Sequence, residues 1–106
     1  MNAFGLLQVS DINRGAALFR ETEGAVLLDV RGTDEYAEGH IPGSVNIPLQ
    51  LLPRKEGLPE DLDTPLFVYC RSGARSRRAA AFLENIGYSN VKNIGGILNW
   101  DGELEV

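Results

Sequence analysis

The stretch Leu66-Phe67-Val68-Tyr69-Cys70, followed by Arg71-Ser72-Gly73-Ala74-Arg75-Ser76, decides the fold of this chain. The first five residues form a nearly continuous apolar run of aromatic and β-branched side chains, which is typical of a strand covered on both faces. Beyond the loop, apolar residues recur at helical spacing and predict an amphipathic helix that ends near Gly87: Ala79, Phe82, Leu83 and Ile86. The segment is therefore predicted to form a buried strand, a short loop and a helix.

Strand and helix patterns alternate along the rest of the chain. Short apolar runs predict further strands at residues 25–30, 45–48 and 91–94, with a weaker candidate at residues 6–9. Ser10 is expected to cap a helix that reaches about Glu21. The alternation predicts an α/β fold with a mostly parallel, five-stranded sheet flanked by helices. Because no repeat or linker-like stretch interrupts the pattern, residues 1–106 are expected to form a single domain.

Composition limits the classes of function. The 106 residues, 43% of them apolar, suffice for one hydrophobic core. A net charge of −5 makes nucleic acid and anionic membranes unlikely partners, and no apolar run approaches the roughly 18 residues of a membrane span. One Cys and one His exclude an intrachain disulfide and a Cys-rich zinc site. We expect a soluble, cytoplasmic protein.

Cys70 is the candidate nucleophile. It ends a central strand, where parallel sheets place their ligands, and it precedes a helix N-terminus, whose free N–H groups favour negative charge. Such a setting lowers the pKa of a thiol and makes the thiolate available at neutral pH. The alternative, a cysteine that is only packed, requires neither Gly73 nor the flanking arginines, Arg71 and Arg75.

Charged residues near the predicted site have more ordinary explanations as well. Arg77 and Arg78 are expected on a solvated helix face. Asp29 and Arg31 end the neighbouring strand, and Glu35 lies on a predicted short helix beyond it. We expect an Asp29 or Glu35 pair with an arginine to order the loop rather than to transfer protons.

Three further segments, together with the Cys70 loop, resemble small single-domain members of the rhodanese (sulfurtransferase) family. They are Leu28-Asp29-Val30-Arg31, Tyr36-Ala37-Glu38-Gly39-His40-Ile41-Pro42-Gly43-Ser44 and Asn93-Ile94-Gly95-Gly96-Ile97-Leu98-Asn99-Trp100. The four motifs occur in the family's order and cover nearly the whole chain. The resemblance implies the rhodanese-like three-layer fold. Ser44 departs from the usual Ala, and the segment before Gly95-Gly96 is one residue shorter than the commoner spacing.

The resemblance also implies an activity. In this family the cysteine takes a sulfane sulfur from an anionic donor such as thiosulfate, holds it as a persulfide and passes it to an acceptor. Cys70 matches that position, and the substrate-binding N–H groups belong to the loop residues Arg71, Ser72, Gly73, Ala74, Arg75 and Ser76. No metal or organic cofactor is needed. With no second Cys in the chain, the acceptor must be external: cyanide, a small thiol or a partner protein.

Two other functions remain open at this point. Phosphatases of similar topology use C-x-x-x-x-x-R, one residue longer than the interval from Cys70 to Arg75, so a phosphatase is the weaker alternative. A non-catalytic or regulatory module that binds an anion or a protein on the same loop is the other. His40 is expected to be held by backbone hydrogen bonds rather than to act as a base, and Trp100 either packs in the core or lines the site rim.

Overall fold

A computed structural model of the protein describes residues 11–106. It contains a four-stranded parallel sheet in the order β2-β1-β3-β4. The strands are β1 (Val26–Asp29), β2 (Ser44–Asn46), β3 (Leu66–Cys70) and β4 (Val91–Gly96). The α/β prediction is confirmed, with four strands in the described residues instead of five. The fifth predicted strand, at residues 6–9, lies outside them.

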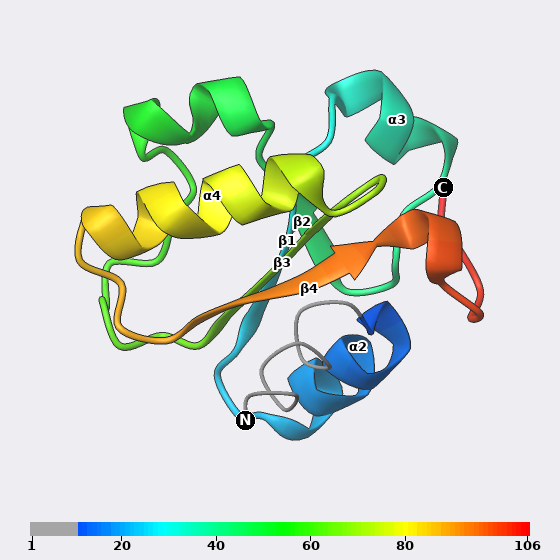
Figure 1. Ribbon diagram of the computed structural model, residues 1–106, viewed down its shortest axis with the longest axis horizontal. Helices are drawn as coiled ribbons and strands as arrows, with labels where there is room; N and C mark the ends of the chain where they lie inside the picture. The colour runs from blue at the N-terminus through cyan, green and yellow to red at the C-terminus, as the bar shows by residue number, and fades with distance from the viewer. Residues whose placement is uncertain (1–10) are drawn as a thin grey trace.

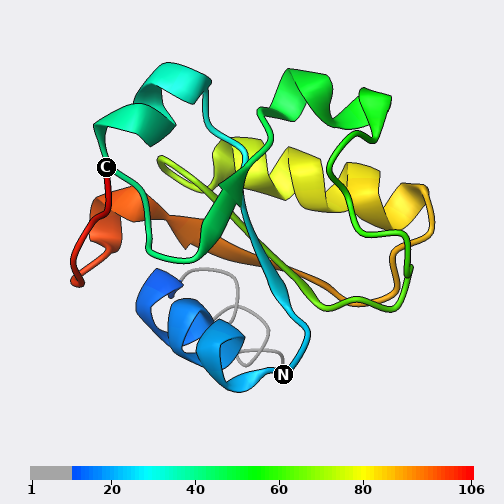
Figure 2. The ribbon, with the colours of Figure 1, turned by 180° about the vertical axis from the view of Figure 1, so that it is seen from behind.

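Helices cover both faces of the sheet and make three layers (Figures 1 and 2). One face carries α2 (Ile12–Glu21), and the other carries α4 (Ala74–Asn85) with the 3₁₀ helix η1 (Leu49–Arg54). The short helices α3 (Thr33–Glu38) and η2 (Ile97–Asn99) lie at the end of the sheet where β3 and β4 finish. Within residues 11–106, no helix is both long enough and apolar enough to cross a membrane.

The helix boundaries largely follow the sequence pattern. Helix α2 ends at Glu21 as predicted, but its N-cap is Asp11, whose carboxylate accepts the N–H groups of Asn13 and Arg14 at 3.1 and 3.2 Å. Ser10, the predicted cap, lies outside the described residues. Helix α4 ends at Asn85, just before Gly87, whose φ of 115° suits the chain reversal there.

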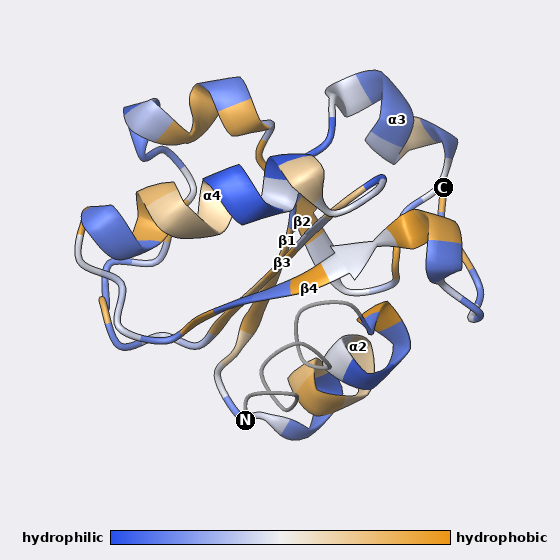
Figure 3. Cartoon of the chain, in the orientation of Figure 1, coloured by the Kyte–Doolittle hydropathy of each residue, from blue (hydrophilic) through white to orange (hydrophobic). Residues whose placement is uncertain are grey.

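The central strand β3 is buried on both faces, and its side chains alternate between two core clusters. Leu66, Val68 and Cys70 face the layer of α4, whereas Phe67 and Tyr69 face the layer of α2. In Figure 3 the hydrophobic colour accordingly predominates along β1 and β3, while β4 and the helices are mixed. This alternation places the Cys70 thiol under the N-terminal part of α4.

Candidate active site

The Cys70 thiol lies at the base of the loop that joins β3 to α4. Its side chain is fully buried, and Sγ accepts hydrogen bonds from the N–H groups of Gly73 at 3.0 Å and Ser76 at 3.3 Å. Burial opposes ionisation of the thiol, but hydrogen bonds from Ser76, Gly73 and Ser72 outweigh it. The pKa of Cys70 therefore lies below its ordinary value. The geometry favours a thiolate that is stabilised by backbone dipoles.

Two glycines let the loop adopt this shape. Gly73 is the N-cap of α4, and its φ of 101° is a left-handed conformation that residues with side chains disfavour. In this conformation its N–H donates to Sγ. Gly96 lies against the loop on β4, where an added Cβ would sit 2.6 Å from the Ser72 Cα. The Leu98 N–H then donates to the carbonyl of Arg71 at 3.2 Å. The end of β4 therefore supports the loop through direct backbone contact.

An ion pair ties the loop to α3. Both nitrogens at the tip of Arg75 donate to the Glu35 carboxylate, at 2.8 and 3.0 Å. Arg75 holds the pKa of Glu35 at about 2, well below its ordinary value. The structure thus brings together two residues 40 positions apart, and the positive charge of Arg75 at the site is partly balanced.

Asp29 and Arg31 form a second, buried ion pair beside β3. The Arg31 guanidinium donates to both Asp29 oxygens, with a shortest distance of 2.6 Å, and to the carbonyl of Gly39 at 2.8 Å. It also lies 5.8 Å from the centre of the Tyr69 ring. Burial opposes the charge on Arg31, but Asp29 more than compensates and raises its pKa. Their contacts connect the end of β1 to the turn after α3, so the pair orders the surroundings of the site.

The remaining predicted residues lie at the surface. Arg71, Ser72 and Ala74 are exposed on the loop, and Arg77 and Arg78 are exposed on α4, as expected for a solvated face.

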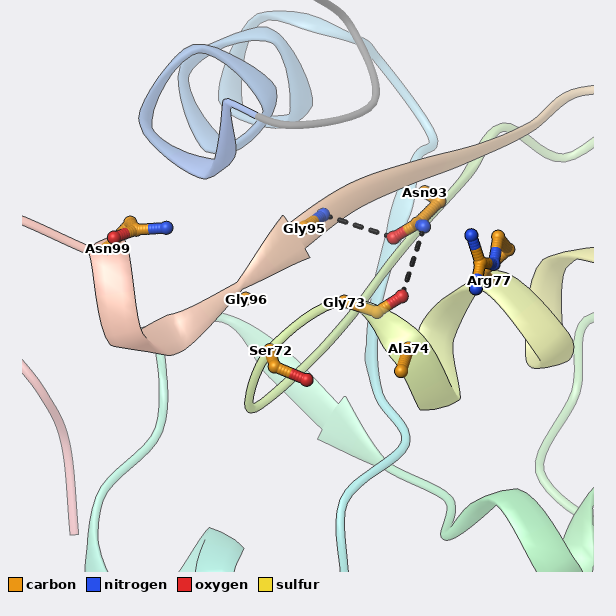
Figure 4. A pocket seen from close by; sticks show the side chains of 8 residues that line it. All are labelled: Ser72, Gly73, Ala74, Arg77, Asn93, Gly95, Gly96 and Asn99. Carbon is orange, nitrogen blue, oxygen red and sulfur yellow. Dashed lines mark hydrogen bonds between the residues drawn. The ribbon is translucent and has the colours of Figure 1, made fainter. Parts of the chain in front are cut away.

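A cavity of about 340 Å³ adjoins the loop on the side of β4 (Figure 4). Its lining consists of Ser72, Gly73, Ala74, Arg77, Asn93, Gly95, Gly96 and Asn99.

Asn93 and Asn99 belong to the last of the four sequence motifs, but neither is predicted from the sequence to be a site residue. Asn93 lies on β4 three residues before Gly96, and Asn99 lies on η2. The available signal was a polar residue close to the carboxyl end of a strand, the edge where parallel sheets build their sites.

His40 and Trp100 have local partners. His40 Nδ1 lies 2.9 Å from the Tyr36 carbonyl, and the two rings stack with centroids 3.6 Å apart, so the ring is held by the backbone as predicted. Trp100 packs against the core cluster on the α2 side, and its Nε1 donates to the Glu103 carbonyl at 3.0 Å. In the part of the chain that the structure describes, no group of three His, Cys, Asp or Glu residues is placed to hold a metal ion.

The ion pair at Glu35 leads to a prediction for the pH dependence of stability. A carboxylate whose folded pKa is lowered to about 2 stabilises the fold above its unfolded pKa, near 4.5, and loses this contribution as the pH falls toward 2. Both side chains are about one-third exposed, at 32% and 37%, so screening limits the effect to about 1 kcal/mol or less. In urea unfolding at pH 7, 4 and 2.5, Glu35→Gln should therefore lose less stability on acidification than the wild type. An identical loss in both proteins would contradict the prediction.

Known proteins resemble this chain in sequence and in fold. Residues 15–103 match the rhodanese-like domain family. The chain is 44% identical over 82 residues to a sulfurtransferase of Allochromatium vinosum, covering 76% of this chain and 75% of that protein. It is 40% identical over 83 residues to the thiosulfate sulfurtransferase GlpE of Pseudomonas entomophila, covering 76% and 72%. A solved structure titled rhodanese with anions, from E. coli, superposes with a TM-score of 0.70 at 30% identity, covering 76% of this chain and 96% of that one.

Proposed function

The chain belongs to the rhodanese-like domain family, and we propose that it moves a sulfane sulfur from thiosulfate to a thiophilic acceptor through a persulfide on Cys70. Relatives named sulfurtransferase support sulfur transfer in general. The observation that carries the finer proposal is the pair of N–H groups, from Gly73 and Ser76, that donate to Sγ. Both groups point at Sγ and can stabilise negative charge on the sulfur.

In the first half-reaction, the Cys70 thiolate attacks the outer sulfur of thiosulfate. An S–S bond to Sγ forms as the bond between the two thiosulfate sulfurs breaks, and sulfite leaves with that bond's electron pair. The product is a persulfide whose outer sulfur carries the negative charge. The loop N–H groups from Arg71 to Ser76 are proposed to surround this sulfur and stabilise its charge.

In the second half-reaction, an external nucleophile attacks the outer sulfur. With cyanide, a C–S bond forms, the S–S bond breaks, and its electrons return to Sγ as the thiolate while thiocyanate leaves. A thiol or a protein acceptor would attack in the same way. Cys70 is the only cysteine of the chain, so it has no second thiol to complete this step.

The first test is the intact mass of the protein before and after thiosulfate, and again after cyanide. The mass of the protein should increase by one sulfur atom after thiosulfate and return to its starting value after cyanide, with release of thiocyanate. A reduced thiol that gains no sulfur from thiosulfate or from other sulfane donors would overturn the proposal. In that case, slow alkylation of Cys70 at neutral pH would favour a binding module, and hydrolysis of an aryl phosphate would favour a phosphatase.

Arg75→Ala is expected to raise the KM for thiosulfate roughly threefold to tenfold, the size of one weakened charge contact. The change removes a cation near Cys70 and leaves the Glu35 carboxylate unpaired, and both effects disfavour a doubly charged donor. Steady-state kinetics with varied thiosulfate would measure it. Arg78→Ala removes an exposed arginine of the same helix and is the matched control. An unchanged KM in Arg75→Ala, or an equal rise in the control, would contradict the prediction.

A further inference from the structure

The Asn93 side chain connects β4 to the loop that holds Cys70. Its Oδ1 accepts the N–H of Gly95 at 3.0 Å and the Ser76 hydroxyl at 2.7 Å, and its Nδ2 donates to the Gly73 carbonyl at 3.4 Å. Figure 4 shows the amide between the strand and the loop, with the contacts to Gly95 and Gly73 drawn. The pairing of β3 with β4 is irregular at this point, because Val68 pairs with Asn93 whereas Tyr69 pairs with Gly95. The irregularity lies where the side chain turns toward the loop.

The contacts to Oδ1 determine how the amide is oriented. The N–H of Gly95 can only donate, so the atom that faces it must be the amide oxygen. An amide oxygen can only accept, so the Ser76 hydroxyl donates toward Oδ1 at 2.7 Å, and the Gly73 carbonyl, at 3.1 Å, is its second and longer acceptor. Asn93 is thus the nearer of the two acceptors that set the position and direction of the Ser76 hydroxyl.

The two loop residues that Asn93 holds are the two whose N–H groups donate to Sγ. We propose that Asn93 is a positioning residue, which keeps Gly73 and Ser76 in the orientation that stabilises negative charge on the Cys70 sulfur. Asn93 makes no hydrogen bond to Sγ in the part of the chain that the structure describes. It acts through the loop, and its importance for sulfur transfer rests on the proposed function of Cys70.

Charged groups around Cys70 do not explain this arrangement. They are Asp29 and Arg31 at the end of β1, Glu35 of α3, Arg71 and Arg75 around the loop, and Arg77 of α4, which lines the cavity with Asn93. Asn93 hydrogen-bonds to none of them. Substituting Asn93 with a neutral residue therefore leaves these charges in place and removes the amide contacts to the loop and to the Gly95 N–H.

The test is the pH dependence of Cys70 alkylation by iodoacetamide, a neutral reagent, in Asn93→Ala. Weaker support of two N–H donors should raise the midpoint of the profile by about half a unit to one unit, since one net hydrogen bond contributes about 1 kcal/mol. Asn90→Ala removes an amide just before β4 whose side chain makes no hydrogen bond to residues 11–106, and it should keep the wild-type midpoint. A midpoint that stays or falls in Asn93→Ala would overturn the proposal.

Ser76 provides a second readout, because its hydroxyl links the Asn93 amide to the Gly73 carbonyl. If Asn93 acts through Ser76, the double variant Asn93→Ala/Ser76→Ala should shift the midpoint by less than the sum of the single shifts. Additive shifts would contradict this route. If Asn93→Ala fails to fold, Asn93→Gln keeps the residue neutral but moves the amide away from the loop by one methylene, so its midpoint should also rise. Alkylation does not require sulfur uptake, so a failure of the proposed function would appear separately, as a wild type that gains no sulfur.

Discussion

Cys70→Ser should take up no sulfur from thiosulfate and should release no thiocyanate when cyanide is added. Serine is close in size and its Oγ can accept the same N–H groups of Gly73 and Ser76, so the loop should keep its shape. A hydroxyl stays protonated at neutral pH, however, and the chain contains no other thiol to replace the lost one. Intact mass and thiocyanate release, measured beside the wild type, should show complete loss of both signals.

The control for this variant is its folding. Circular dichroism and urea unfolding should resemble those of the wild type, which separates loss of chemistry from loss of structure. Ser89→Ala removes an exposed hydroxyl in the turn before β4 and serves as the positive control. It should take up one sulfur atom as the wild type does. A gain of one sulfur atom by Cys70→Ser would contradict the assignment of Cys70 as the sulfur carrier.

Arg31→Leu should lower the free energy of unfolding by about 3–5 kcal/mol, the usual cost of removing one partner of a buried ion pair. The variant leaves the fully buried Asp29 carboxylate without its guanidinium and removes the hydrogen bond to the Gly39 carbonyl. Urea unfolding followed by circular dichroism would measure the loss. A small domain has only about 5–15 kcal/mol of stability in total, so this change should also reduce the yield of folded protein.

Two further variants test the cause of that loss. Arg77→Leu removes an exposed arginine from α4 and should change stability by no more than about 0.5 kcal/mol. The double variant Asp29→Asn/Arg31→Leu should recover part of the loss, because the amide is neutral and its oxygen can still accept the N–H of residue 31. If Arg31→Leu is as stable as the wild type, the ion pair between Asp29 and Arg31 does not stabilise this end of the sheet.

The elements that are predictable from the sequence are those with strong local patterns. The run from Leu66 to Cys70 matches β3, and the apolar spacing before Gly87 matches the buried face of α4. The sequence predicts Ser10 as the cap of α2, whereas the structure has Asp11, because both neighbours are good N-caps and the choice between them depends on where the chain enters the helix. The weak pattern at residues 6–9 predicts a fifth strand, and this segment lies outside the residues that the structure describes.

By itself the sequence determined the α/β fold, the strand-loop-helix unit and the position of the one thiol at its strand end, because apolar periodicity and a helix N-terminus are local properties. Only the tertiary structure decided which groups meet around that thiol. Arg75 pairs with Glu35, Asn93 holds Ser76, and Gly96 admits the loop against β4, although these partners are 40, 17 and about 25 residues apart in the chain. Such contacts depend on the order and register of the strands, which bring the carboxyl ends of β1, β3 and β4 to one edge of the sheet.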